Sequence, residues 1–258
     1  MFLVENYGIA ILLCFITMLC WGSWANTTKL TSKDWRFELL YWDYGFGILI
    51  TTLLLAFSLG SFGTEGRSFL EDIKQAENSN LGSAFIGGIV FNAANILLVA
   101  AIGIAGMSVA FPVGIGIALV LGVIVNYISN PQGNPVLIFG GVALITLAIL
   151  LNARAYQKLQ TSTEGGVSKK GLILSVVSGC LMGLFYKYVA DSMVTDFKMP
   201  EAGKLTPYTA LVFFALGVVM SSFLFNSLQM KRPFAGAPLS ISTYFNGKLK
   251  DHLVGILG

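Results

Sequence analysis

The stretch "GGIVFNAANILLVAAIGIAGMSVAFPVGIGIALVLGVIVNY" occupies residues 87–127 and contains no charged residue. It is long enough for two helices of about 20 apolar residues each, the length that crosses about 30 Å of hydrocarbon. The segment "GIAG" at residues 103–106 lies near its centre and leaves room for a tight turn only. This stretch therefore predicts a hairpin of two membrane-spanning helices.

The whole chain of 258 residues shares this composition. It is 55% hydrophobic and 11% charged, with a mean hydropathy of +0.75, whereas soluble domains carry about 25% charged residues. Seven charge-poor windows lie near residues 7–25, 41–60, 82–103, 107–128, 135–152, 171–190 and 206–226. The alternating pattern of barrel strands is absent, so each window is predicted to be a helix. The predicted fold class is an all-α polytopic membrane protein.

Several other classes are disfavoured. The first window follows "MFLVENYG", which lacks Lys and Arg, and no small-residue cleavage site follows it, so it is not a signal peptide. The chain has one histidine, no cysteine or carboxylate cluster and no nucleotide-binding loop, which argues against an enzyme, a cofactor or a metal. The basic residues are spread over short loops, so no nucleic-acid partner is expected.

The loop charges predict an orientation in the membrane. The odd-numbered loops contain eleven Lys and Arg residues and the even-numbered loops contain four. The positive-inside rule therefore places the odd-numbered loops in the cytoplasm and the N-terminus outside. One of these loops, "QTSTEGGVSKK" at residues 160–170, has the composition of a linker. It divides a first half, residues 1–159, from a second, residues 171–258.

The two halves share a pattern of helix and loop lengths. In each, a helix, a loop, a second helix and some twenty polar-leaning residues follow one another. Five helices is an odd number, so a second copy would run inverted through the membrane, as in many secondary transporters. The last residues, "LKDHLVGILG", begin another apolar helix and stop after one or two turns. We therefore expect the chain to be a C-terminally truncated fragment, with seven complete helices and the start of an eighth.

Two charged residues, Asp43 and Lys187, lie inside the predicted helices. A charge at the membrane centre costs at least about 2.5 kcal/mol, so both are functional candidates. Asp43 is the candidate coupling residue. Lys187, within "GCLMGLFYKYVAD" at residues 179–191, has three interpretations: it extends to the headgroups, lines a cavity with Tyr188, or forms a structural ion pair. Gly179 and Gly183 form a small-residue face that favours close helix packing.

Further polar and aromatic residues are candidates for solute binding. Asn92 and Asn95 are three residues apart, hence on one helix face, and either join helices or contact solute. Trp21 and Trp24 also share a face, near Asn26, and either anchor the helix at the interface or offer a stacking wall and an amide.

The fourth window contains a predicted hinge. Pro112 should kink the helix, and Gly114 softens the same region. Ordinary kinked packing is the alternative interpretation for both residues.

These residues resemble a known family. "LCWGSWANTTKL" at 19–30, "ELLYWDYGFG" at 38–47, the stretch quoted first and "MKRPFAGAPLSISTYFNGKLKDHLVGILG" at 230–258 are similar to the ureide permease family of the drug/metabolite transporter superfamily, close to its glucose/ribose uptake branch. The chain departs from plant members in having Trp24 followed by Ala25 rather than proline, Lys187 in place of a small residue or proline, and a short central linker. These differences resemble bacterial members.

The resemblance implies a ten-helix carrier in a bacterial inner membrane, built from two inverted five-helix halves. Its partners would be the lipid bilayer, a small polar solute such as a sugar, a ureide or a nucleobase, and protons; a homodimer stays open. The expected function is secondary-active transport by alternating access. The alternative is a non-transporting membrane subunit or sensor.

Overall fold

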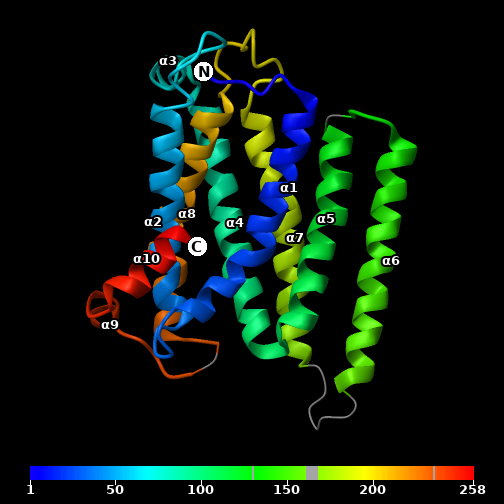
Figure 1. Cartoon of the computed structure of the whole chain (residues 1–258), viewed down its shortest axis with the longest axis vertical. Coiled ribbons are helices and arrows are strands. Elements are labelled where there is room, and N and C mark those ends of the chain that lie inside the picture. The colour runs from blue at the N-terminus through cyan, green and yellow to red at the C-terminus, as the bar shows by residue number, and fades with distance from the viewer. Residues whose placement is uncertain (130, 161–167, 235) are drawn as a thin grey trace. The chain divides into compact units, whose positions relative to one another are not determined.

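The structure is a computed structural model that describes residues 1–129, 131–160, 168–234 and 236–258. Within these residues the chain is helical, and an isolated bridge between Met193 and Leu205 is the one β-type pairing. The elements are α1 (Tyr7–Ser23), the 3₁₀-helix η1 (Trp24–Leu30), α2 (Phe37–Phe57), α3 (Phe69–Gln75), α4 (Asn78–Ala105), α5 (Met107–Ser129), α6 (Pro135–Gln160), α7 (Lys169–Ser192), α8 (Pro207–Lys231), α9 (Ile241–Phe245) and α10 (Leu249–Leu257) (Figure 1). The predicted all-α class is confirmed.

Six of these helices are long and apolar enough to cross a membrane: α2, α4, α5, α6, α7 and α8. The first predicted window forms α1, an apolar helix of 17 residues, at the lower limit of about 17 residues for a span. The chain continues from α1 directly into η1 at Trp24. The protein is therefore a multi-pass membrane protein.

The predicted helix boundaries follow from local chemistry. Gly106 joins α4 to α5 with a φ of 82°, a left-handed conformation that favours glycine. Pro135 and Pro207 open α6 and α8, where a missing backbone N–H costs nothing. The hairpin predicted at residues 103–106 is thus confirmed.

Helix α3 lies between the predicted windows 41–60 and 82–103, where the sequence predicts a loop. Ser68 and Glu71 form a capping box at its start, in which the Ser68 N–H and hydroxyl both donate to the Glu71 carboxylate. These bonds hold the pKa of Glu71 below its usual range. The pattern Ser-x-x-Glu is visible in the sequence and would have predicted this helix start.

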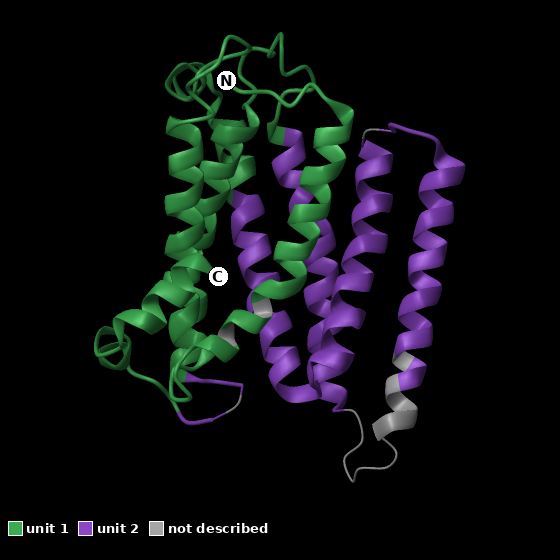
Figure 2. Ribbon diagram, in the orientation of Figure 1, with its two compact units in different colours: residues 1–85, 192–231, 238–258 green, residues 86–191, 232–237 purple. Residues whose placement is uncertain are grey.

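The chain forms two compact units (Figure 2). Unit 1 contains residues 1–85, 192–231 and 238–258, and unit 2 contains residues 86–191 and 232–237. These units differ from the two halves predicted from the sequence, and the inverted repeat stays a prediction. Most of the predicted linker, residues 161–167, lies outside the described residues.

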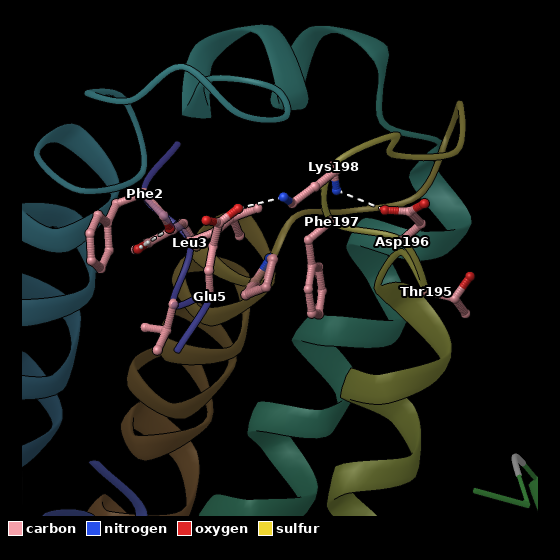
Figure 3. Close-up of a pocket in the computed structure, with 10 residues that line it drawn as sticks. Phe2, Leu3, Glu5, Thr195, Asp196, Phe197 and Lys198 are labelled. Atoms are coloured by element: carbon pink, nitrogen blue, oxygen red, sulfur yellow. Dashed lines mark hydrogen bonds and ion pairs between the residues drawn. The ribbon is translucent and has the colours of Figure 1, made fainter. Parts of the chain in front are cut away.

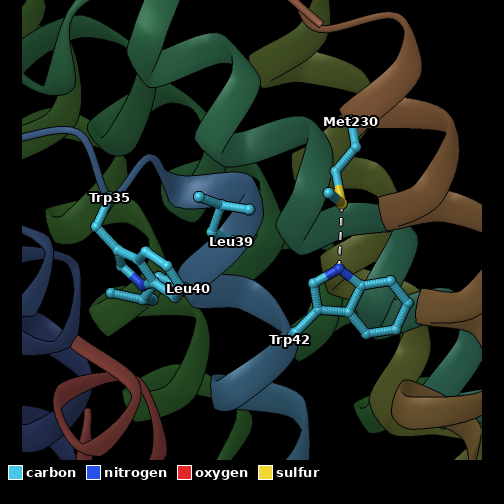
Figure 4. Packing of buried hydrophobic residues seen from close by; sticks show 5 residues of the cluster. All are labelled: Trp35, Leu39, Leu40, Trp42 and Met230. Carbon is cyan, nitrogen blue, oxygen red and sulfur yellow. Dashed lines mark hydrogen bonds between the residues drawn. The ribbon is translucent and has the colours of Figure 1, made fainter. Parts of the chain in front are cut away.

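The core of unit 1 is the antiparallel pair α2 and α8. At one end, Trp42 of α2 donates its indole N–H to the sulfur of Met230 at 3.2 Å (Figure 4). At the other end, buried Ala56 of α2 lies in one apolar cluster with Val212 of α8. This pairing holds α2 in place over its whole length.

A buried hydrogen-bond network around Arg67 and Asp72, which we call the polar lock, joins two segments at the end of unit 1 near α3. Asp72 is fully buried and accepts from the Arg67 guanidinium at 2.9 Å and from the Thr206 N–H at 2.7 Å. The same guanidinium donates to the carbonyls of Pro200, Glu201 and Lys204. The segment before α8 is thus fastened to the segment between α2 and α4.

In unit 2, glycines bring α5 and α7 into backbone contact. A Cβ atom on Gly179 would lie 2.5 Å from the carbonyl oxygen of Gly114, and one on Gly183 would lie 2.8 Å from the Leu121 Cβ. The close packing predicted for the Gly179–Gly183 face is confirmed. Helix α5 continues as one helix through Pro112, which lies in its second turn.

Candidate functional site

The most distinctive polar group of unit 1 is Asp43, which lies within the membrane-spanning helix α2 and is 2% exposed. Its carboxylate accepts a hydrogen bond from the Tyr244 hydroxyl at 2.6 Å. The Nδ1 atom of His252 lies 3.0 Å and 3.1 Å from the two carboxylate oxygens. A carboxylate from α2, a phenol from α9 and an imidazole from α10 therefore form one cluster, the Asp43 cluster.

Glycines on both helices allow α10 to approach α2 this closely. A Cβ atom on Gly255 would lie 2.5 Å from the Cβ of Asp43, and one on Gly47 would lie 2.3 Å from the carbonyl oxygen of Ile256. Asp43 and Gly47 are four residues apart and His252 and Gly255 are three apart, so each pair shares a helix face. The sequence therefore places a small residue beside each polar partner of the contact.

Aromatic rings surround the imidazole. The rings of Trp35 and Tyr244 meet His252 edge-on, with centroids 4.8 Å and 4.9 Å away. Burial of the Tyr244 phenol, with its hydrogen bond to the Asp43 carboxylate, raises the pKa of this tyrosine. Tyr244 is therefore a stable hydrogen donor at neutral pH.

Trp24 packs inside unit 1. It is 6% exposed and stacks on Tyr44, with ring centroids 5.3 Å apart. Trp21, by contrast, is 42% exposed. The two tryptophans were predicted to share a helix face, but their surroundings differ. The α-helix ends at Ser23, and Trp24, which begins the 3₁₀-helix, packs against Phe37 and Tyr44. Asn26 accepts a hydrogen bond from Lys29 at 2.8 Å.

Helix α8 contributes two buried amides that the sequence interpretation missed. Asn226 donates to the backbone carbonyl of Glu38 at 2.9 Å. Its side-chain oxygen and that of Gln229 are buried without a hydrogen-bond partner among the described residues. The sequence does contain a signal for this pair, because Asn226 and Gln229 are three residues apart, like Asn92 and Asn95.

In unit 2, Asn92 and Asn95 are both buried on α4. Between them in sequence, the carbonyl of Ala94 accepts a hydrogen bond from the Ser178 hydroxyl of α7 at 2.6 Å. This part of α4 therefore meets α7. Contact of either asparagine with solute stays a prediction.

Lys187 forms an ion pair with Asp191, one helical turn further along α7, at 2.9 Å. The lysine side chain is 41% exposed. Of the three interpretations open from the sequence, the structure thus shows an ion pair. Tyr188 lies beside it and is also exposed, and the proposed roles of both in solute binding stay predictions.

A surface pocket lies at the end of unit 1 that carries the N-terminus (Figure 3). It has a volume of about 910 Å³ and includes Phe2, Phe197 and Tyr208 among its lining residues. Lys198 and Glu5 form an ion pair across it. Both charges are exposed, so this pocket lacks the buried polar groups of the Asp43 cluster.

Comparison with known proteins identifies the family of this chain. The profile of the Ureide permease family matches residues 40–169, half of the chain. The chain belongs to the ureide permease family. It is 24% identical to Ureide permease 3 of Arabidopsis thaliana and 26% identical to Ureide permease 1 of the same plant. The two alignments cover all of this chain and 83% and 81% of those proteins.

A protein of another plant matches a shorter part of this ureide permease family member. It is 27% identical to Probable ureide permease A3 of Vigna unguiculata, over 58% of this chain and 41% of that protein. No solved structure matches it. Membership of this family and the six membrane-spanning helices make the chain a transporter of small solutes and not an enzyme.

Proposed function

We propose that this chain is a proton-coupled, secondary-active carrier that moves a small ureide-like or nucleobase-like solute by alternating access. The observation that carries the proposal is the Asp43 cluster, a buried carboxylate within a membrane span bound to an imidazole and a phenol. Such a group is expensive to maintain as an isolated charge in a membrane. It is therefore expected to have a function that needs the charge.

The chemistry of the cluster suits proton coupling. Asp43 and His252 can hold one proton between them, as carboxylate with imidazolium or as carboxylic acid with neutral imidazole. Both arrangements remove the cost of an unpaired buried charge. A movement of α10 against α2 would break the 3.0 Å contact and change how tightly the proton is bound. A proton taken up on one side could then be released on the other.

The solute class rests on the relatives and on the buried amides. The relatives that cover the whole chain are named ureide permeases. Ureides and nucleobases carry several N–H donors, which suit the partnerless amide oxygens of Asn226 and Gln229. An unpaired buried acceptor costs about 1–3 kcal/mol, so a solute that donates to it would gain affinity.

The residues singled out from the sequence stay proposals for solute contact within each unit. Those proposed to contact solute are Trp21, Trp24, Asn26, Asn92, Asn95, Lys187 and Tyr188. Pro112 and Gly114 of α5 are proposed to act as a hinge.

The test uses the full-length protein reconstituted in liposomes with an imposed pH gradient. Uptake of labelled allantoin, uracil and glucose would be measured with and without the gradient. We expect accumulation of allantoin or uracil that depends on the gradient. Asp43→Asn should abolish this accumulation but still exchange internal for external solute, because it removes the proton site and not the solute path. Glu5→Gln, at an exposed carboxylate of the same unit, is the matched control.

Three outcomes would contradict the proposal. Gradient-driven accumulation that survives in Asp43→Asn would separate Asp43 from coupling. Accumulation of glucose alone would point to a sugar carrier. Absence of uptake and exchange for all three solutes in the wild-type protein would favour a non-transporting membrane subunit.

A further inference from the structure

A second pocket of unit 1 lies beside the Asp43 cluster and has a different chemistry. Its volume is about 780 Å³, and it is lined by residues of α2, of α8 and of the segment from Leu239 to Phe245. Trp42, Phe46, Phe223 and Phe245 form its aromatic wall, and Lys231 contributes a cation. We call it the aromatic pocket. Among the described residues that line it, none is acidic.

The aromatic pocket extends from the end of a membrane span into its apolar part. Lys231 is the last residue of α8, and Phe223 lies eight positions earlier. At about 1.5 Å per residue, the pocket covers about 12 Å along the helix axis. A long lipid-like molecule that places a polar group beside Lys231 would therefore place its chain beside Phe223.

Trp42 is buried at the base of this pocket, but the outer part of the wall is exposed among the described residues. Phe223 and Phe245 are exposed over more than half of their surface, and Ile241 is similarly exposed. In a bilayer, such side chains contact acyl chains. Lysine at the end of a span favours contact with a phosphate. Lys248 and Lys250 lie close by in sequence at the start of α10 and add positive charge to this end of unit 1.

We propose that the aromatic pocket binds an anionic phospholipid, with an acyl chain against Phe46 and Phe223 and the phosphate at Lys231. Charge complementarity selects this occupant, since the lining residues combine an apolar wall with a cation and the hydroxyls of Ser227 and Ser240. The site does not depend on the proposed transport function. The aromatic pocket does adjoin the Asp43 cluster, because the ring of Tyr244 lines the pocket while its hydroxyl donates to Asp43.

Trp42 provides a direct reporter, because its ring lines the pocket. In the 258-residue chain with Trp21, Trp24 and Trp35 changed to Phe, Trp42 is the remaining tryptophan of these residues. Its fluorescence would be measured in liposomes that contain increasing fractions of brominated phosphatidylglycerol or brominated phosphatidylcholine. Bromine quenches a tryptophan that it contacts. We expect the anionic lipid to quench Trp42 at a fraction about fivefold lower than the zwitterionic lipid, as for one lysine–lipid contact.

The variant Lys231→Gln should remove this preference while both lipids still quench. Lys198→Gln removes a cation from the other pocket of unit 1 and should leave the preference for the anionic lipid unchanged. Equal quenching by the two lipids in the reporter protein would overturn the proposal, as would a preference that survives in Lys231→Gln. Absence of quenching by either lipid would show that protein, such as a second copy, covers the pocket, and would also overturn it.

The tryptophan substitutions could prevent folding, since Trp24 and Trp35 are buried. A second measurement avoids them. Native mass spectrometry of the otherwise unchanged protein, released from mixed liposomes, should retain phosphatidylglycerol on the wild type and about fivefold less on Lys231→Gln. Equal retention by the two proteins would overturn the proposal independently.

Discussion

The Nδ1 atom of His252 lies 3.0 Å from a carboxylate oxygen of Asp43, although 209 residues separate them in the chain. The contact joins the second turn of the membrane-spanning helix α2 to the short helix α10. It pairs the chain's one histidine with one of the two charged residues inside the predicted spans. The relationship can be tested by asking whether the two residues act as a unit.

We expect His252→Gln to lower proton-driven uptake about tenfold or more, because a hydrogen bond to a charged group is lost. Thermal unfolding in detergent tests the contact itself. His252→Gln should lower the unfolding temperature of the wild type but have little further effect in the Asp43→Asn background, since the partner is already absent. Additive losses of unfolding temperature in the double variant would show that the residues act separately.

The glycine contact between α2 and α10 predicts a steric effect. Gly47→Ala should cost about 1–3 kcal/mol, because its Cβ atom would lie 2.3 Å from the Ile256 carbonyl oxygen and force the helices apart. Gly103→Ala is the matched control, since a Cβ atom there meets nothing within 4 Å. Thermal unfolding in detergent would compare the two variants. Equal unfolding temperatures would mean that α10 does not pack on α2.

The polar lock around Arg67 predicts a loss of stability. Asp72→Ala should destabilise unit 1 by about 3 kcal/mol, because it leaves the guanidinium without its buried partner. The segment before α8 should then open, and trypsin should cleave at Lys198 or Lys204 faster than in the wild type. In the double variant Lys198→Gln with Asp72→Ala, loss of the faster cleavage would assign it to Lys198, and persistence would assign it to Lys204. Unchanged cleavage in Asp72→Ala would contradict this role of the lock.

The ion pair between Glu5 and Lys198 predicts a local pH dependence. The hydrogen bond and charge of Lys198 hold the pKa of Glu5 below its usual 4.5. Because this folded-state pKa is lowered, the contribution of the pair is present above pH 4.5 and is lost as the pH falls through the lower folded value. Titration of labelled glutamate carboxyls by NMR should show the midpoint of Glu5 rising in Lys198→Gln. An unchanged midpoint would mean that the pair does not form in solution.

Lys187 and its partner can be separated by paired variants. The exposed ion pair with Asp191 is expected to contribute little to folding, so Lys187→Gln should insert normally. If the lysine also contacts solute, as we propose, its loss should raise the half-saturation concentration about tenfold. Asp191→Asn removes the ion pair but keeps the lysine, and should change that concentration by less than about twofold. Equal effects of the two variants would assign Lys187 to the ion pair only.

Local sequence signals predicted most of the helices. The charge-poor windows, the glycine turn at residues 103–106 and the prolines at 135 and 207 are all properties of short continuous segments, so they can be recognised without tertiary information. The capping box at Ser68 and Glu71 is equally local and was overlooked. The change from α-helix to 3₁₀-helix at Trp24 was not predictable in this way, because Trp24 is placed by packing against Phe37 and Tyr44.

The sequence by itself determined that this is a polytopic helical membrane protein, and it singled out Asp43, because an apolar chain makes each charge within it conspicuous. The tertiary structure decided what Asp43 is bound to. His252 and Tyr244 lie in short helices some 200 residues away, and nothing in their local pattern indicates the partner. Their meeting depends on how closely α10 approaches α2 at Gly47 and Gly255. That approach is a property of two packed surfaces, and it has no local signature in the chain.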